Sequence, residues 1–252
     1  MNNTTTTPKS KIIYGIHTVM EAVEAGKEIE KVIIRKGLTG DLANELKELL
    51  TARQVPFQIV PAEKIDRLSS KNHQGVLAFV SLIEYAKIEN IIPELYEKGE
   101  TPFVLVLDQI TDVRNFGALV RTAECAGVHA ILLPEKGSAQ INTDALKTSA
   151  GALNYVPICR ATDLYKTVRF LKDSGMEVVA ATEKSTISYT QPAYDKPVVL
   201  ILGSEESGIS SPLLSLADHK VKVPLQGKIE SLNVSVAGGI LMFQIVKNRM
   251  NS

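Results

Sequence analysis

A polar loop that leads directly into an apolar run is the feature that most constrains the fold of this chain. The loop spans residues 222–233 and holds Ser231 and Asn233, two residue types that often cap helix N-termini. The run that follows, residues 234–246, places apolar side chains on every face of a helix and includes two adjacent glycines that permit close packing. The pattern predicts a buried C-terminal helix that also packs against a second subunit. Its start exposes backbone N–H groups that can bind polar ligand groups.

The composition is that of a globular chain with one large domain or two smaller ones. Of its 252 residues, 44% are hydrophobic, so a sizeable core can be buried. Cys125 and Cys159 form no C-x-x-C pair, so we expect free thiols in a reducing cytoplasm and no metal site.

Residues 1–10 lack an apolar core, which predicts a disordered tail and argues against a secretory signal. No apolar run has the length that spans a bilayer, so no membrane partner is expected.

Strand and helix patterns alternate over residues 11–83, which predicts a small α/β domain at the N-terminus. The expected strands are 31–35, 56–60 and 75–81, and the expected helices are 18–25 and 41–53. The next stretch, residues 84–101, is charged and carries Pro93 and Gly99, so it is expected to be a linker with one short helix.

A second α/β domain is expected over residues 102–252. The strand candidates are 103–107, 130–133, 177–181, 198–202 and 220–223, and helical patterns separate them. That alternation predicts a mainly parallel sheet covered on both faces. No G-x-G-x-x-G sequence follows any strand, which argues against a Rossmann methyltransferase or a dinucleotide enzyme.

Three polar segments of this domain resemble a known set of motifs. They are Asn115-Phe-Gly-Ala-Leu-Val-Arg-Thr-Ala123, Leu200-Ile-Leu-Gly-Ser-Glu-Glu-Ser-Gly-Ile209, and residues 223–237. In order and spacing, over about 150 residues, they are similar to the motifs of the SpoU-type (TrmH family) 2′-O-ribose RNA methyltransferases of the SPOUT superfamily. The resemblance implies a C-terminal trefoil knot, S-adenosyl-L-methionine as methyl donor, a homodimer and no metal.

The N-terminal domain carries a second resemblance. Residues 13–23 and 73–76 look like the ends of the small L30-like substrate-binding domain found in the 23S rRNA guanosine 2′-O-methyltransferases of this family. His73 alone would not support this, because a lone histidine before a buried strand is usually structural. The paired signatures imply an RNA partner, either 23S rRNA or an assembling ribosomal particle.

Arg121 matches the arginine that the family uses at its active site. It follows Gly117 by four residues, so on a helix its guanidinium can reach over the Gly117 surface toward Asn115. A guanidinium binds phosphate through paired hydrogen bonds, but it is a poor base because it keeps its proton in ordinary surroundings. The alternative from the residues alone is a surface ion pair with Glu124 or Asp112.

The resemblance assigns four more residues to the catalytic set: Asn115, Glu205, Ser231 and Asn233. Asn115 could instead be a plain helix N-cap. Glu205 could cap a helix, orient Asn115 or Arg121, or hold a ribose hydroxyl.

The methyl-donor site implied by the resemblance consists of three loops of the knot. The matching residues are Thr182, Leu202, Gly203, Val223, Leu225 and Leu232. Leu225 and Ile209 depart from the residues usual in the family, but both keep the apolar volume.

Any basic surface that binds RNA must be a local cluster, because the chain has no basic excess: Lys+Arg and Asp+Glu are equal at 28 each. The candidate cluster is Lys64, Arg67 and Lys71, and the alternative is a solvated face without a function.

Taken together, the motifs and their resemblance predict S-adenosylmethionine-dependent 2′-O-methylation of a guanosine in 23S rRNA. The alternatives are a tRNA ribose methyltransferase and a catalytically silent RNA-binding assembly factor of the same fold.

Overall fold

The computed structural model describes residues 11–139 and 141–250, so the tail expected at residues 1–10 lies outside the described residues. The chain divides into two compact units, Met1–Glu84 and Tyr85–Ser252. Within the described ranges, no helix is long and apolar enough to cross a membrane.

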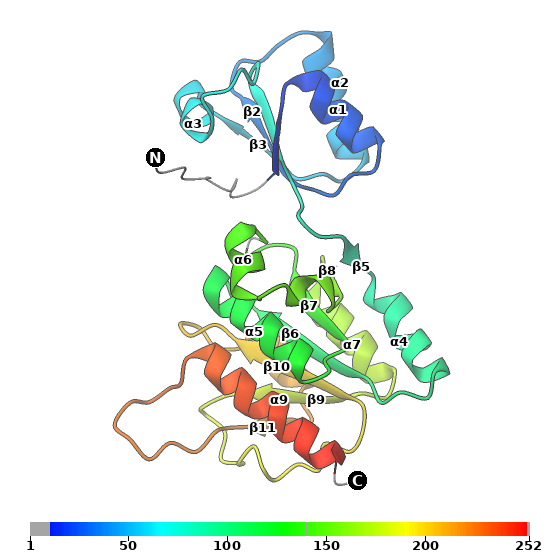
Figure 1. Cartoon of the computed structure of the whole chain (residues 1–252), viewed down its shortest axis with the longest axis vertical. Coiled ribbons are helices and arrows are strands. Elements are labelled where there is room, and N and C mark those ends of the chain that lie inside the picture. The colour runs from blue at the N-terminus through cyan, green and yellow to red at the C-terminus, as the bar shows by residue number, and fades with distance from the viewer. Residues whose placement is uncertain (1–10, 140, 251–252) are drawn as a thin grey trace, which may run out of the picture. The chain divides into compact units, whose positions relative to one another are not determined.

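The N-terminal unit is a four-stranded mixed sheet with helices on both faces (Figure 1). The strands, in the order β1-β4-β2-β3, are β1 (Lys11–Tyr14), β4 (Val76–Val80), β2 (Ile29–Arg35) and β3 (Phe57–Val60). Helices α1 (Ile16–Glu24) and α2 (Asp41–Ala52) bury Val19, Leu46 and Leu50 on one face. Helix α3 (Ala62–Leu68) buries Ile65 on the other. The α/β unit expected from the sequence is confirmed.

The C-terminal unit is built on a seven-stranded sheet in which every pairing is parallel. In spatial order its strands are β11 (His219–Val221), β9 (Glu177–Ala181), β10 (Val198–Gly203), β6 (Phe103–Asp108), β7 (Ala130–Pro134), β8 (Ile158–Ala161) and β5 (Tyr85–Ala86). Burial on both faces explains why β6 and β10 are continuous apolar runs rather than alternating ones. The predicted parallel sheet is confirmed, with β5 and β8 added at one edge.

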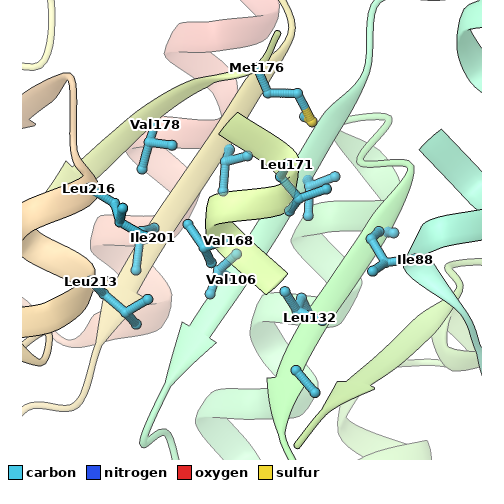
Figure 2. Packing of buried hydrophobic residues seen from close by; sticks show 14 of the residues in the cluster. Ile88, Val106, Leu132, Val168, Leu171, Met176, Val178, Ile201, Leu213 and Leu216 are labelled. Atoms are coloured by element: carbon cyan, nitrogen blue, oxygen red, sulfur yellow. The ribbon is translucent and has the colours of Figure 1, made fainter. Parts of the chain in front are cut away.

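Two layers of helices cover this sheet. Helices α4 (Ile88–Glu97), α7 (Leu164–Asp173) and α8 (Ser211–Leu216) share one core with alternate residues of the strands. In Figure 2, Val168 and Leu171 of α7 lie over Val106, Leu132 and Ile201 of the sheet. Each such side chain contributes about 1.5–3 kcal/mol when fully buried. The other face carries α5 (Val113–Cys125), α6 (Thr143–Thr148), the 3₁₀ turn Ala152–Asn154 and α9 (Val234–Met250).

The stretch expected to be a linker, residues 84–101, lies largely within the C-terminal unit. Strand β5 pairs with β8, and α4 buries Ile88, Ile92 and Leu95 in the core shared with α7 and α8. Spacings of four and three residues place these side chains on one helix face. The short helix is present, but its apolar stripe fixes it to the sheet, so the boundary between the units falls between Glu84 and Tyr85.

Helix α9 packs against α5 and β10, and in Figure 1 it runs alongside α5. Gly238 is required there, since an added Cβ would lie 2.5 Å from Leu119 Cδ2 and 2.8 Å from Leu202 Cδ1. At the other end of α9, the Arg249 guanidinium donates to the carbonyl oxygens of Thr101 at 2.9 Å and Pro102 at 3.0 Å, among others. Burial lowers the pKa of Arg249 from its ordinary value. These contacts fix both ends of the helix that opens at the candidate site.

Candidate functional site

Three side chains from distant parts of the sequence meet where β6 and β10 end and α9 begins. Asn233 Nδ2 donates to Asn115 Oδ1 at 2.9 Å and to Glu205 Oε1 at 2.8 Å. Asn115 Nδ2 donates to the same Glu205 oxygen at 3.3 Å. All three were predicted as site residues, and we call them the Asn-Glu-Asn cluster.

Asn115 is not the N-cap of α5. The helix begins at Val113, and Asp112 is the cap, accepting from the Asn115 backbone N–H at 2.7 Å. The alternative interpretation of Asn115 as a plain cap is therefore wrong. Because Asp112 satisfies the helix start, the Asn115 amide is available to bond across to Glu205 and Asn233.

Glu205 sits on a tight turn directly after β10. Ser204 Oγ accepts from the Ser207 N–H at 3.1 Å, and Ser204 O accepts from the Gly208 N–H at 2.9 Å. Gly203 must be glycine, since an added Cβ would lie 2.2 Å from the carbonyl carbon of Gly208. The turn brings Glu205 Oε1 to the first N–H of α9, that of Val234, at 3.2 Å. A carboxylate is stabilised there because a helix start carries partial positive charge.

Asn233 is the N-cap of α9, as predicted. Its Oδ1 accepts from the Ser235 N–H at 3.0 Å and from Ser235 Oγ at 2.5 Å. Its amide nitrogen makes the two cluster bonds, so one side chain both caps the helix and joins the cluster. Ser231, the other predicted cap, is exposed in the preceding loop and lies outside this network.

A cavity of about 330 Å³ adjoins the cluster. Its polar lining comprises Gln109, Thr111, Asp112, Asn115, Ser204, Glu205, Glu206 and Ser207. Glu205 Oε1 already accepts three N–H groups, whereas Oε2 makes no hydrogen bond to any residue of the described ranges. That oxygen is free to accept a hydrogen bond from a ligand hydroxyl. A lining of hydroxyls, amides and carboxylates suits a sugar.

Arg121 lies apart from the cluster within this chain. It follows Asn115 by six residues, which places it about 9 Å further along the helix axis and on a different face. Helix α6 packs against Gly117, where an added Cβ would lie 2.6 Å from Thr148 Cβ, so the reach of Arg121 toward Asn115 stays a prediction. Arg121 is exposed and has no ion pair with any described residue, so the alternative of a pair with Glu124 or Asp112 is wrong.

The residues predicted to hold the methyl donor lie at the carboxyl ends of three neighbouring strands. Thr182 follows β9 and donates its N–H to Val221 O of β11 at 2.9 Å, and Gly203 ends β10. Leu202 is buried against α9, so it can offer a ligand only its backbone. Parallel neighbours bring these loops to one edge of the sheet, where ligands of α/β sheets bind.

The third donor loop has open backbone groups. It contains Val223, Leu225 and Leu232, and among the described residues the peptide groups of 223–232 form no backbone–backbone hydrogen bond. A ligand's polar edge can therefore be bound by these groups.

The basic residues expected to bind RNA in the N-terminal unit are all exposed. Lys64 and Arg67 are three residues apart on α3, and Lys71 lies over the Tyr14 ring at 5.4 Å from its centroid. His73 is structural: its Nδ1 accepts from the Gly75 N–H at 3.0 Å, which leaves Nε2 to donate to Asp66 at 3.0 Å.

Asp108 and Gln109, at the end of β6, were not predicted as site residues from the sequence. Asp108 is buried and its Oδ2 accepts from the Ser210 N–H at 2.7 Å, while the next residue, Gln109, has a φ of 57°. The sequence does carry a signal for this feature, because Asp108 is the last residue of an otherwise apolar strand. A carboxylate buried there requires a nearby hydrogen-bond donor.

Comparison with known proteins identifies the class. Residues 102–243 match the SpoU rRNA Methylase family, and residues 12–86 match the family described as RNA 2′-O ribose methyltransferase substrate binding. The chain therefore belongs to the SpoU rRNA Methylase family and is an RNA 2′-O-ribose methyltransferase by class. The family and the α/β architecture expected from the motifs are confirmed.

Relatives of similar length support this membership. A Bacillus subtilis protein named as a TrmH family tRNA/rRNA methyltransferase, YacO, is 31% identical over 237 residues, covering 94% of this chain and 95% of its own. Two crystal structures share the fold at a TM-score of 0.61. One is the SpoU methyltransferase AviRb of Streptomyces viridochromogenes in complex with AdoMet, 20% identical, covering 100% of this chain and 95% of its own. The other is an AdoMet-bound rRNA methyltransferase of Sinorhizobium meliloti, 24% identical, covering 95% and 87%.

Proposed function

We propose that this protein methylates the 2′-hydroxyl of a guanosine in 23S rRNA, using S-adenosylmethionine and no metal. The observation that carries the proposal is the Asn-Glu-Asn cluster beside a polar cavity, at the edge where the three candidate donor loops also end. The two solved structures of this fold described above were determined with AdoMet bound.

The donor loops fit such a ligand. The loop of residues 223–232 offers peptide groups that have no backbone partner among the described residues, and such groups suit an adenine edge. Thr182, Leu202, Gly203, Val223, Leu225 and Leu232 would hold the donor. When bound, S-adenosylmethionine supplies an activated methyl group on a sulfonium that becomes neutral as the methyl leaves.

The role of the chain is then to position the ribose. Glu205 Oε2 accepts a hydrogen bond from a ribose hydroxyl, while Asn115 and Asn233 hold the carboxylate in place. Holding the ribose hydroxyl in line with the methyl donor can lower the activation barrier by up to roughly 7–11 kcal/mol in favourable cases. Ser231, exposed beside the cap residue, contributes its hydroxyl to the same ribose or its phosphate.

Arg121 supplies the phosphate contact. Its guanidinium is exposed and unpaired within the described chain, so it can take a phosphate without breaking an ion pair. Its distance from the cluster along α5 suits a substrate nucleotide that extends past the cavity, or a site completed by a second copy of the chain.

Ribosomal RNA is the expected substrate because residues 13–23 and 73–76 resemble the ends of the substrate-binding domain of the 23S rRNA guanosine 2′-O-methyltransferases. Lys64, Arg67 and Lys71 give the N-terminal unit an exposed basic cluster in a chain with no net charge. The test is methyl transfer to transcribed 23S rRNA and to tRNA in parallel, with the modified nucleoside identified by mass spectrometry. Transfer to tRNA alone would overturn the ribosomal assignment while leaving the activity standing.

A further inference from the structure

A second cavity, of about 500 Å³, lies at the end of β6 beside the site cavity. Its walls come from the ends of β6 and β7 and from the starts of α7 and α8, and they include Asp108, Lys136, Leu164, Tyr165 and Leu213. No residue assigned to catalysis or to the methyl donor lines it. The two cavities share Gln109 and Gly137, so they adjoin across the carboxyl edge of the sheet.

Gln109 stands between the two cavities in an unusual backbone conformation. Its φ of 57° lies in the left-handed region, which is uncommon for residues other than glycine and concentrates at functional sites. Asp108, the residue before it, is buried and anchored by the Ser210 N–H at 2.7 Å, so the strand end cannot relax freely. The Gln109 amide is exposed and bonds to no side chain or backbone group of the described residues.

The chemistry of the second cavity suits a flat ring with polar edges. Leu164 and Leu213 give it apolar walls, and Tyr165, 37% exposed, offers an aromatic face. Gln109 adds one amide donor and one acceptor, and Lys136 adds a positive charge at the rim. Proteins bind unstacked RNA bases with this combination, since aromatic faces stack on the base and amides pair with its edge.

We propose that this cavity binds the base of the nucleotide whose ribose enters the site cavity, and that Gln109 is a specificity-determining residue. The inference rests on the proposed function, because the ribose must occupy the cavity beside the Asn-Glu-Asn cluster. A volume of about 500 Å³ is ample for a purine, which pockets of roughly 300–1,000 Å³ accommodate. The adjoining cavities let one nucleotide span both.

The first test is a titration of the full-length, ¹⁵N-labelled protein with the four nucleoside 5′-monophosphates, followed by NMR. The Gln109 side-chain amide signals are identified by their loss in Gln109→Ala. We expect at least one monophosphate to shift them, and Tyr165→Ala to weaken the apparent affinity by about fivefold or more, as lost stacking on an aromatic ring requires. Tyr155→Ala is the matched control, because Tyr155 is 77% exposed and lines neither cavity.

Three results of the titration would overturn the proposal: unshifted Gln109 signals with every monophosphate, unchanged affinity in Tyr165→Ala, or equal weakening by Tyr155→Ala. Gln109→Asn serves as a second variant, since asparagine tolerates a positive φ and only shortens the reach of the amide. It should weaken binding while melting at the wild-type temperature. The titration needs no methyl transfer, so it remains readable if the proposed activity fails.

The second test uses the RNA that the wild-type protein methylates. Replacing the target base should lower kcat/KM in the wild type at least tenfold and should have a smaller effect in Gln109→Ala, with affinity for S-adenosylmethionine unchanged in both. An equal effect in the two proteins would contradict a role for Gln109 in base selection. Absence of methyl transfer by the wild type would instead count against the proposed function.

Discussion

Asn233 and Asn115, 118 residues apart in the sequence, are joined by a hydrogen bond of 2.9 Å that links the start of α9 to the first turn of α5. The same Asn233 side chain caps α9 through the Ser235 N–H. Helix capping and site geometry therefore depend on different atoms of one residue, since Oδ1 forms the cap and Nδ2 makes the cluster bonds.

Substitutions of Asn233 should separate these two tasks. Asn233→Ala removes both and should lower the free energy of unfolding by about 1 kcal/mol, the usual cost of a lost cap. Asn233→Ser keeps a good cap but has no amide to donate to Glu205 and Asn115. We expect near wild-type stability for the serine variant and, in both variants, a loss of turnover on the order of 10²-fold, as a small displacement of a positioned group produces. Urea denaturation and single-turnover transfer measure the two effects, and full activity in Asn233→Ser would contradict the role of the cluster.

A side chain at Gly203 should disrupt the turn that carries Glu205. In Gly203→Ala the added Cβ meets the Gly208 backbone at 2.2 Å, and backbone cannot move aside as a flexible side chain can. We expect destabilisation of about 3 kcal/mol or more, among the larger effects of single substitutions. Gly227→Ala is the matched control, because nothing lies within 4 Å of its added Cβ. Equal unfolding midpoints for the two variants in urea would show that the turn is looser than described.

Much of this architecture could be predicted from the sequence, but the strands near one edge of the seven-stranded sheet and the place of α4 could not. Runs such as β6 and β10 are long and apolar enough to be recognised alone, whereas β8 is four residues with Arg160 inside it, too short and mixed for a periodic signal. Residues 84–101 were expected to be a linker because the stretch is charged and contains Pro93. Helix α4 nevertheless belongs to the C-terminal unit, because Ile88, Ile92 and Leu95 pack into its core.

The site could be predicted as residue types in motifs, but not as geometry. Asn115, Glu205 and Asn233 were found by resemblance, and no local pattern shows that they converge. Asp112, rather than Asn115, caps α5 because the helix begins two residues before Asn115, and helix boundaries shift by that much without altering periodicity. The reach of Arg121 toward Asn115 stays a prediction, and the sequence pattern also gave no sign that α6 packs on Gly117, because that contact joins distant segments.

Arg121 should be dispensable for folding and required for turnover. It is exposed and makes no ion pair with the described residues, so Arg121→Ala should change the free energy of unfolding by no more than about 0.5 kcal/mol. Loss of a charged phosphate contact should still reduce turnover by about 10²-fold or more. Arg121→Lys should rescue poorly, since an ammonium cannot reproduce a planar two-point contact. Wild-type rates in the alanine variant would remove Arg121 from the mechanism.

The outer face of α9 should form the interface of a homodimer. Val236 and Phe243 are 51% and 48% exposed on a helix whose opposite side is buried, and such apolar surface marks an interaction site. Light scattering should give twice the 27.4 kDa chain mass. Phe243→Glu should shift the mass toward the monomer, while Tyr155→Glu, at an exposed tyrosine on another element, should not. A wild-type monomer at micromolar concentration would exclude this interface.

Methyl transfer by the wild-type protein tests the central claim most directly. Full-length protein is incubated with methyl-labelled S-adenosylmethionine and transcribed 23S rRNA, with EDTA-treated and untreated samples in parallel, and the RNA is digested to nucleosides. We predict label in 2′-O-methylguanosine from both samples, and its loss in Asn115→Ala. Label on a base, or none in any RNA offered, would contradict 2′-O-methylation by this protein.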